Sequence, residues 1–143
     1  MARGITREQI EMLGRVPLFS ACSEKELRQV ARLGTPIDVK AGRELTKEDQ
    51  RGAEFFLVLD GSATCRIGGK KMATYEPGDF FGEMALLDQG PRSATVTADT
   101  PMRLLVVSAP EFGGLLAEAP SIARKMLVTM AGRVRALEKP LRH

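Results

Sequence analysis

The residues of this chain that are best suited to chemistry lie between Gly82 and Ser93. A short helical turn that begins near Gly82-Glu83 would direct unpaired backbone N–H groups at one point, which favours an anion there. Gly82 lets a ligand approach the backbone closely, and the small Ala85 keeps the next amide accessible. Arg92 supplies a planar guanidinium suited to bidentate contact with a phosphate. These residue types predict a phosphate-binding site.

Glu83 is out of place beside a bare anion, because two negative charges repel each other. It suits the site if its carboxylate accepts hydrogen bonds from a neutral group such as a sugar hydroxyl. A ligand that carries both a phosphate and sugar hydroxyls is a nucleotide. The alternative is a salt bridge between Glu83 and Arg92 that closes the segment without a ligand.

The rest of the inventory argues against catalysis. The only histidine is His143, the last residue, so no His-based acid–base pair, triad or His-rich metal site is expected. The glycine-rich run 61–71 differs from a phosphate loop in its spacing, and no Ser or Thr follows its lysine. Cys22 and Cys65 are expected to be reduced thiols. We therefore predict that the protein is not an enzyme and holds no metal.

Length and composition favour one globular domain. The chain has 143 residues, of which 43% are hydrophobic and 27% charged, and this is an ordinary size and composition for a single domain. No run approaches the ~18 consecutive apolar residues that cross a bilayer. The first residues also lack the apolar core of a secretion signal. We expect a cytoplasmic protein with no membrane segment.

The basic character of the chain belongs to its C-terminal segment. The formal net charge is +3. Residues 119–143 hold six basic residues against one acidic residue, Glu138, a charge of +5 that leaves −2 for residues 1–118. Nucleic-acid binding by this segment, with its steep salt dependence, is therefore an alternative function.

Local patterns predict a helix, a series of short strands and then further helices. Ser23–Glu26 is a capping box that starts a helix ending at Gly34. The almost continuous apolar run of Glu54–Asp60 indicates a strand buried on both faces. About eight short strands separated by glycine turns predict a jelly roll. The recognisable strands are 37–40, 43–46, 54–60, 63–67, 70–75, 94–98 and 102–107.

The last part of the chain is expected to be helical again. A second capping box, Ser108–Glu111, starts this part. After Pro120, apolar residues at helical spacing predict a helix that runs to about Glu138, because Pro140 follows. The stripe consists of Ile122, Met126, Met130, Val134 and Leu137. The predicted organisation is one α+β domain. It has N-terminal helices in 1–34, an eight-stranded antiparallel β-roll in 35–107 that contains the segment 81–94, and C-terminal helices in 108–143.

The run Phe81-Gly82-Glu83-Met84-Ala85-Leu86-Leu87, followed by Arg92-Ser93-Ala94, closely resembles the phosphate-binding cassette of the cyclic nucleotide-binding domain family. We call residues 81–94 the cassette. The resemblance extends to Val16–Phe19, to the turn glycines and to the approach Pro77–Gly82. Kinase regulatory subunits, bacterial catabolite activators and cyclic-nucleotide-gated channels belong to this family. The resemblance implies a β-roll that acts as a ligand-operated switch.

It also implies roles for single residues. Arg92 would hold the exocyclic phosphate oxygens, together with the backbone amides of Ala85 and Ser93 and the Ser93 hydroxyl. Glu83, assisted by the Gly82 backbone, would accept the ribose 2′-hydroxyl. In this family a threonine after the arginine favours cGMP, whereas serine or alanine goes with cAMP, so Ser93 predicts cAMP, with cGMP the less favoured ligand. The predicted ligand-binding residues are Gly82, Glu83, Met84, Ala85, Arg92, Ser93, Ala94 and Arg133.

The same resemblance implies that the C-terminal helix covers the base and moves when ligand binds. Met126, Leu127 and Met130 could form an apolar lid, or they could pack on the roll. Arg133 stands where some bacterial channel domains place an arginine over the purine, and its alternative is a solvated side chain. Gly113-Gly114 could be a hinge, or two small residues chosen for close packing.

We expect a stand-alone regulatory domain that acts on an effector protein the sequence does not identify. Catabolite activators carry a DNA-binding domain after the long helix, and channels carry membrane helices. Neither is found in this sequence. A homodimer formed through the C-terminal helix, and a ligand-free roll that serves as a scaffold, remain alternatives.

Overall fold

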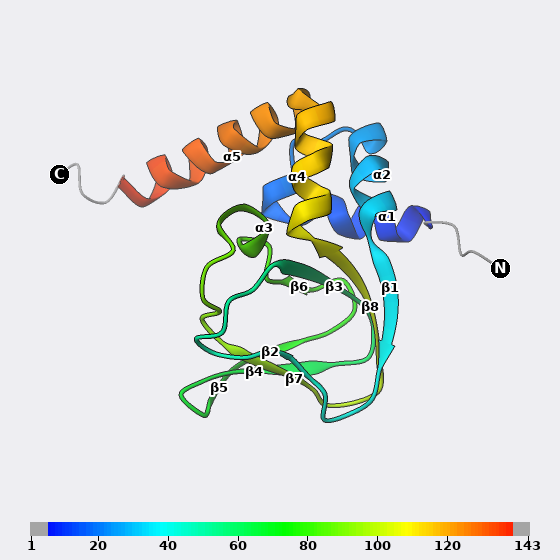
Figure 1. The fold of residues 1–143 in the computed structure, drawn as a ribbon, viewed down its shortest axis with the longest axis vertical. Helices are drawn as coiled ribbons and strands as arrows, with labels where there is room; N and C mark the ends of the chain where they lie inside the picture. Colours follow the sequence, from blue (N-terminus) through cyan, green and yellow to red (C-terminus); the bar gives the residue numbers. More distant parts are fainter. Residues whose placement is uncertain (1–5, 139–143) are drawn as a thin grey trace.

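Figure 1 shows the helices at one end of the molecule and the strands at the other. The computed structural model describes residues 6–138. Eight antiparallel strands form two four-stranded sheets that face each other. The predicted α+β class, an antiparallel jelly roll flanked by N- and C-terminal helices, is confirmed.

Each sheet combines strands that are far apart in the sequence. The first has the order β1 (Thr35–Val39), β8 (Met102–Ser108), β3 (Glu54–Asp60), β6 (Phe80–Phe81). The second has the order β2 (Glu44–Thr46), β7 (Thr95–Ala98), β4 (Ala63–Ile67), β5 (Lys70–Tyr75). All seven ranges expected from the sequence are strands, with ends that agree within two residues.

Two strands differ from the expectation for identifiable reasons. The two-residue strand β6 is too short to show an alternating pattern, and its pairing of Phe81 with Phe56 defines it instead. Strand β1 begins at Thr35 and includes Pro36, which pairs with Leu105. The proline is tolerated because β1 is an edge strand, where a missing backbone donor costs little.

Strand β3 is buried on both faces, as predicted. Phe55 and Leu57 belong to the core beneath the helices, which we call the helical core. Phe56 and Val58 point to the other side of the strand and belong to the core between the two sheets, which we call the roll core. Side chains alternate along a strand, so one strand supplies a wall to each core.

The N-terminal region holds more helix than the patterns located. Helix α1 (Arg7–Gly14) precedes the single turn η1 (Pro17–Phe19) and helix α2 (Glu24–Leu33). Helix α1 starts with a capping box formed by Thr6 and Gln9, whose spacing in the sequence is typical of this motif. The remaining helices are α3 (Ala85–Asp88), α4 (Ala109–Glu118) and α5 (Pro120–Glu138).

One of the two predicted capping boxes forms. The Glu26 N–H donates to Ser23 Oγ (3.2 Å), and the Ser23 N–H donates to Glu26 Oε1 (2.8 Å). At Ser108 the prediction of a capping box was wrong, although α4 begins there. The Ser108 hydroxyl donates to Glu111 Oε1 (2.7 Å) and caps no backbone group. The first N–H of α4, from Ala109, donates to the Ala53 carbonyl, so the roll satisfies it.

Phe19 joins three parts of the helical core. Its ring is fully buried and meets Phe55 of β3 edge-to-face, with centroids 5.9 Å apart. It meets Phe112 of α4 in a similar way at 5.8 Å. The turn η1, the roll and the C-terminal helices are therefore packed around one aromatic side chain.

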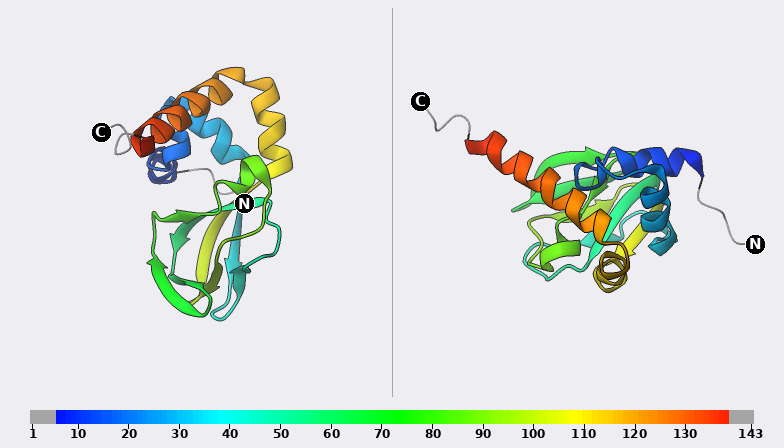
Figure 2. Two further views of the ribbon diagram at one scale, coloured as in Figure 1. Left: turned by 90° about the vertical axis from the view of Figure 1, so that its left-hand side faces the viewer. Right: turned by 90° about the horizontal axis from the view of Figure 1, so that it is seen from above.

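Helix α5 is packed only through its first half. Ile122 and Met126 are buried in the helical core, and Met130 is partly buried there. Val134 and Leu137 are 55% and 77% exposed, because the second half of α5 extends away from the other helices (Figures 1 and 2). The helix predicted to run to about Glu138 is therefore present, and the helical core covers the first three residues of its apolar stripe but not the last two.

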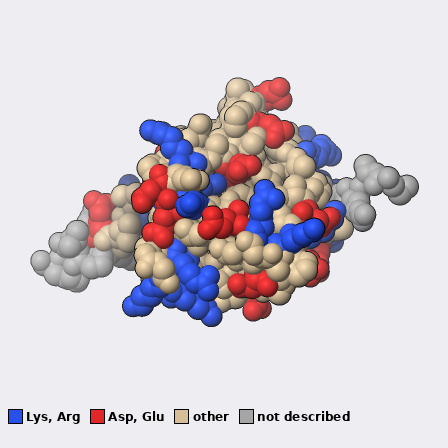
Figure 3. Space-filling view, turned by 60° about the horizontal axis from the view of Figure 1, so that its bottom comes forward, with Lys and Arg blue, Asp and Glu red and all other residues tan. Residues whose placement is uncertain are grey.

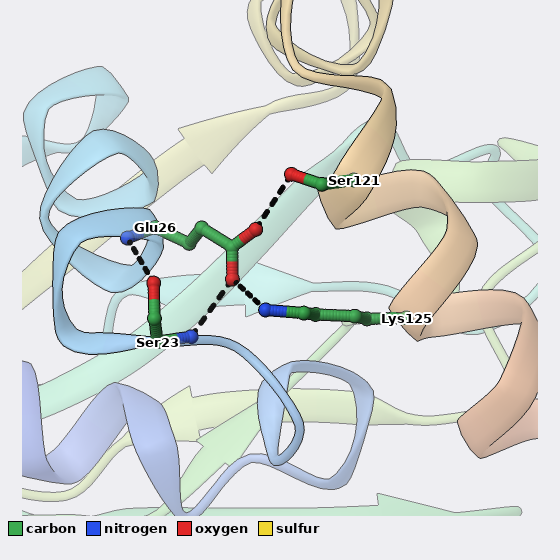
Figure 4. A network of polar contacts seen from close by, with 4 residues as sticks. All are labelled: Ser23, Glu26, Ser121 and Lys125. Carbon is green, nitrogen blue, oxygen red and sulfur yellow. Dashed lines mark hydrogen bonds and ion pairs between the residues drawn. The ribbon is translucent and has the colours of Figure 1, made fainter.

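A buried carboxylate ties α5 to α2 (Figure 4). Glu26 is 7% exposed; its Oε1 accepts from Lys125 Nζ (2.5 Å), and its Oε2 accepts from the Ser121 hydroxyl (2.7 Å). The hydrogen bond from Lys125, followed by those from the Ser23 N–H and Ser121, holds the pKa of Glu26 at about 2, below its usual 4.5. We call Ser23, Glu26, Ser121 and Lys125 the helix latch.

The helix latch should make stability depend on acid pH. Its contribution is complete above pH 4.5 and is lost as the pH falls toward 2, because protonation removes the charge that Lys125 binds. Urea unfolding from pH 7 to pH 2 should show Glu26→Gln about 1–3 kcal/mol less stable at pH 7, with a shallower loss below pH 4.5. The matched control is Glu24→Gln, whose exposed carboxylate pairs with Arg28. If Glu26→Gln and the unchanged chain lose the same unfolding free energy between pH 4.5 and pH 2, the prediction is contradicted.

Candidate functional site

The cassette connects β6 to β7 and carries the short helix α3 beside the helical end of the roll (Figure 1). Its second residue is Gly82, whose φ of 81° lies in the left-handed region that side chains avoid. A Cβ on Gly82 would stand 2.7 Å from Arg92 Nη1 and 2.7 Å from the Glu54 carbonyl oxygen. A glycine is therefore required at this point for two independent reasons.

Arg92 lies near the C-terminal end of the cassette, and its side chain lies between Gly52 and Gly82. A Cβ on Gly52 would stand 1.9 Å from Arg92 Nε, so the guanidinium occupies the space that a side chain would take. Arg92 Nη2 donates to the Glu54 carbonyl (2.8 Å). The Arg92 backbone is held as well, because its N–H donates to the Gln50 carbonyl (2.8 Å). The structure thus brings Arg92 and Gly82 together.

The charge of Arg92 has no counter-ion in the described part of the chain. No ion pair among residues 6–138 includes Arg92. Burial lowers the pKa of its guanidinium, and the nearby charge of Glu54 opposes this shift. A half-buried cation that makes one hydrogen bond to a carbonyl has donors left over, and an anion would both pair its charge and use those donors.

Glu83 lies in the same segment and is half-buried. Within residues 6–138 it forms no ion pair with Arg92, so the alternative of a closing salt bridge is not observed. Its carbonyl accepts the Leu86 N–H (3.2 Å), and no hydrogen bond to its carboxylate is found in the part of the chain described. The carboxylate can therefore accept from a ligand hydroxyl.

The helical turn predicted near Gly82-Glu83 is present, because the carbonyls of both residues accept backbone N–H groups three positions later. Helix α3 itself begins at Ala85 and is four residues long. So short a helix has only a small dipole to attract an anion. The Ala85 N–H donates to the Gly82 carbonyl (3.1 Å), so it must turn away from this bond to reach a phosphate. Ser93 is exposed near the other end of the cassette, where its hydroxyl is accessible.

The two remaining cassette residues named from the sequence have different environments. Met84 is 41% exposed and serves as the N-cap residue of α3 without a side-chain cap. Ala94 is half-buried, and its carbonyl accepts the Thr46 hydroxyl (2.9 Å). The contact with β2 fixes the end of the cassette to the second sheet.

A hollow of about 390 Å³ opens beside Arg92. Its walls are β2, the loop between β2 and β3, and the start of β3, and Glu83 and Ser93 do not line it. Its lining residues are Glu44, Leu45, Thr46, Lys47, Gln50, Arg51, Gly52, Ala53, Glu54 and Arg92. From the sequence, Gly52 was expected only to form a turn. Its second role is to leave space for the Arg92 side chain, and no local pattern shows this role because the two residues are 40 positions apart.

The predicted lid does not cover the cassette in this structure. Arg133 is exposed on the projecting half of α5. Met126 is buried in the helical core, and Leu127 is 71% exposed. Gly113 and Gly114 lie inside α4, where an added Cβ would meet nothing within 4 Å, so the close-packing explanation is wrong.

The face of the roll gives no support to the nucleic-acid alternative. Lys125, one of the basic residues of the C-terminal segment, is bound to Glu26. Lys139 and Arg142 lie outside the described residues. The face of the roll seen in Figure 3 carries basic and acidic side chains side by side. Nucleic-acid sites are instead dominated by one continuous basic surface.

No group of His, Cys, Asp or Glu within residues 6–138 is arranged to hold a metal ion. In the same range, no helix has the length and apolar character needed to cross a membrane.

The β-roll and the cassette with its half-buried arginine define the class of protein. Residues 36–119 match the sequence model of the cyclic nucleotide-binding domain. The chain belongs to this family. The resemblance seen in the cassette is therefore confirmed over most of the chain.

Individual relatives agree with this assignment. The chain is 32% identical over 123 residues to a cyclic nucleotide-gated potassium channel of Rhizobium etli, a match covering 86% of the chain and 34% of the channel. It is 34% identical over 115 residues to a cAMP-dependent protein kinase regulatory subunit of Emericella nidulans, covering 79% of the chain and 28% of that subunit. The chain thus spans about a third of the length of these relatives.

One solved structure matches this chain over nearly the full length of both proteins. It is the N-terminal domain of a transcriptional regulator from Streptomyces coelicolor, with a TM-score of 0.83 and 27% sequence identity. The match covers 91% of this chain and 94% of that domain.

The close contact of Arg92 with Gly52 and Gly82 can be tested by substituting alanine for each glycine. Gly52→Ala should destabilise the fold by about 1–3 kcal/mol, the usual cost of overpacking, because the new methyl group takes the place of Arg92 Nε. In an Arg92→Ala background that cost should largely disappear. Gly82→Ala should stay destabilising in both backgrounds, because its φ and the Glu54 carbonyl are unchanged. Urea unfolding of the single and double variants measures these free energies of unfolding. An equal cost of Gly52→Ala in both backgrounds would contradict the conclusion that Arg92 fills the space beside Gly52.

Proposed function

We propose that this chain binds a cyclic nucleotide at the cassette, prefers cAMP to cGMP, and acts as a binding switch that passes the signal on through α5. The observation that carries the proposal is the half-buried guanidinium of Arg92, held in place without a counter-ion in the described chain. Family membership and the name of the cAMP-dependent kinase regulatory subunit support the choice of ligand. Ser93, which follows Arg92, supports cAMP over cGMP.

The ligand would be held from both ends of the cassette. Its phosphate carries one negative charge, which Arg92 pairs while the Ser93 amide and hydroxyl supply further donors. The ribose hydroxyl lies on the side of Glu83 and Gly82. The Ala85 N–H joins when the turn 82–85 opens and releases the Gly82 carbonyl. Only this last step needs the backbone to move.

Movement of the turn can reach α5 through packed side chains. Leu86 of α3 is buried in the helical core together with Phe112 of α4 and Met126 of α5. A shift of α3 therefore changes the packing beneath both C-terminal helices. A ligand can drive such a change only by as much as its affinity differs between the two arrangements.

In the present arrangement α5 points outward, away from the roll. Arg133 is exposed and α5 extends away from the roll, while the helix latch bonds Lys125 and Ser121 to Glu26. We propose that the latch stabilises this outward position of α5, and that inward movement places Arg133 near the base. Gly113 and Gly114, exposed within α4, are the proposed hinge.

Titration calorimetry with cAMP and with cGMP tests the ligand. cAMP should bind more tightly than cGMP, and Arg92→Ala should weaken cAMP binding about 30- to 150-fold, equivalent to the 2–3 kcal/mol of a charged hydrogen-bonding group. Arg66→Ala, an exposed arginine on β4, is the control that should leave binding unchanged. Dissociation constants above about 100 μM for both nucleotides would overturn the proposal.

The helix latch gives a second test, in which affinity and stability change in opposite directions. Lys125→Met removes the ion pair with Glu26 while the buried anchors Ile122 and Met126 stay, so the outward position of α5 loses stability. cAMP should then bind about three- to tenfold more tightly, although the variant unfolds at lower urea concentration. Arg124→Met, an exposed residue of the same helix, is the control. Unchanged or weaker cAMP binding in Lys125→Met would refute the role of the latch.

A further inference from the structure

A column of stacked side chains crosses the roll core and ends at Arg92. The ring of Tyr75 on β5 stacks on Phe81 of β6, with centroids 5.0 Å apart and planes 17° apart. Phe81 stacks in turn on Phe56 of β3, at 4.9 Å and 16°. The guanidinium carbon of Arg92 lies over the Phe56 ring, 5.9 Å from its centroid. We call Tyr75, Phe81 and Phe56 the aromatic column.

The column connects the two ends of the cassette. Phe81 is the first residue of the cassette, and Arg92 stands near its end, eleven residues later in the chain. Phe56 touches both of them and belongs to neither the cassette nor the loop that supports it. The strand that separates the two cores therefore sets the distance between the approach to the cassette and its arginine.

Arg92 needs such a support, because its other restraints leave freedom. Gly52 and Gly82 provide space for the guanidinium without attracting it, and the Glu54 carbonyl accepts from only one of its nitrogens. A long side chain loses considerable rotamer entropy when it is fixed. A cation over an aromatic face is attracted to the ring, more strongly where water is excluded, and Arg92 is half-buried.

The ring is itself held firmly. Phe56 is 4% exposed and Phe81 6%. Burial, followed by a hydrogen bond with Cys65, raises the pKa of Tyr75 to about 12, so the outer end of the column stays uncharged at physiological pH. A fixed neutral stack offers Arg92 a rigid surface, which reduces the entropy that the ligand would otherwise have to overcome.

We propose that Phe56 is a positioning residue, which aligns Arg92 for a phosphate through its aromatic face and does not contact the ligand itself. This inference rests on the proposed function for its effect on affinity, but the alignment exists without a ligand. Phe56 therefore controls affinity for the charged phosphate through Arg92, in addition to filling the roll core.

The test compares two equally buried phenylalanines that are adjacent in β3. Phe56→Leu removes the ring below Arg92, whereas Phe55→Leu removes a fully buried ring on the opposite face of the strand. Phe56→Tyr keeps an aromatic face, and Phe56 lines a hollow of about 330 Å³. All variants are made in the full chain, and urea unfolding confirms that each is folded.

The first readout needs no nucleotide. In the NMR spectrum of the free protein, the Arg92 Nε–H signal, assigned through Arg92→Lys, should be displaced by the ring current of Phe56. Phe56→Leu should move this signal toward the position of a solvated arginine. Phe55→Leu and Phe56→Tyr should leave it near its original position. An Arg92 signal that does not respond to Phe56→Leu would overturn the proposal, even if the chain binds cAMP.

The second readout is a double-mutant cycle on cAMP affinity. Phe56→Leu should weaken binding about three- to thirtyfold when Arg92 is present, and Phe56→Tyr should restore most of the loss. In an Arg92→Ala background, Phe56→Leu should change the affinity by less than about twofold. An equal loss in both backgrounds, or the same loss from Phe55→Leu, would show a purely structural role and refute the proposal. If the unchanged chain binds no cyclic nucleotide, the proposed function fails, and the NMR comparison still decides whether Phe56 aligns Arg92.

Discussion

The central constraint in this structure is a positive charge that is half removed from water and has no counter-ion in the described chain. Such a charge carries a desolvation cost, and here a single hydrogen bond to the Glu54 carbonyl offsets part of it. Nearby features make the position of Arg92 possible: two glycines without side chains, a backbone tied to the neighbouring loop, and an aromatic ring below the guanidinium. The fold is arranged so that an anion would complete it.

Strand β3 connects this constraint to the rest of the molecule. On one face, Phe56 belongs to the roll core and supports Arg92; on the other, Phe55 meets Phe19 in the helical core. Neither core can repack without affecting this strand. The helices and the cassette are thus physically coupled through one β-strand, as well as through Leu86 of α3.

The sequence predicted what depends on local pattern. The strands were found because alternation and glycine turns are local, and the cassette because its motif is contiguous from Phe81 to Leu87. The part played by Gly52 and Phe56 was not predicted, because both meet Arg92 only in the folded chain. The direction of α5 was not predictable either, since an apolar stripe indicates which face is buried but not where along the helix the partner ends. The roles of the cassette residues toward a ligand remain predictions.

The space beside Gly52 has a consequence for comparing related chains. Because the Arg92 side chain fills the volume of an absent methyl group, the two positions share one fixed space although they are 40 residues apart. A relative with a larger residue in place of Gly52 can accommodate only a shorter or displaced side chain in place of Arg92. Substitutions at these two positions should therefore occur together over evolutionary time.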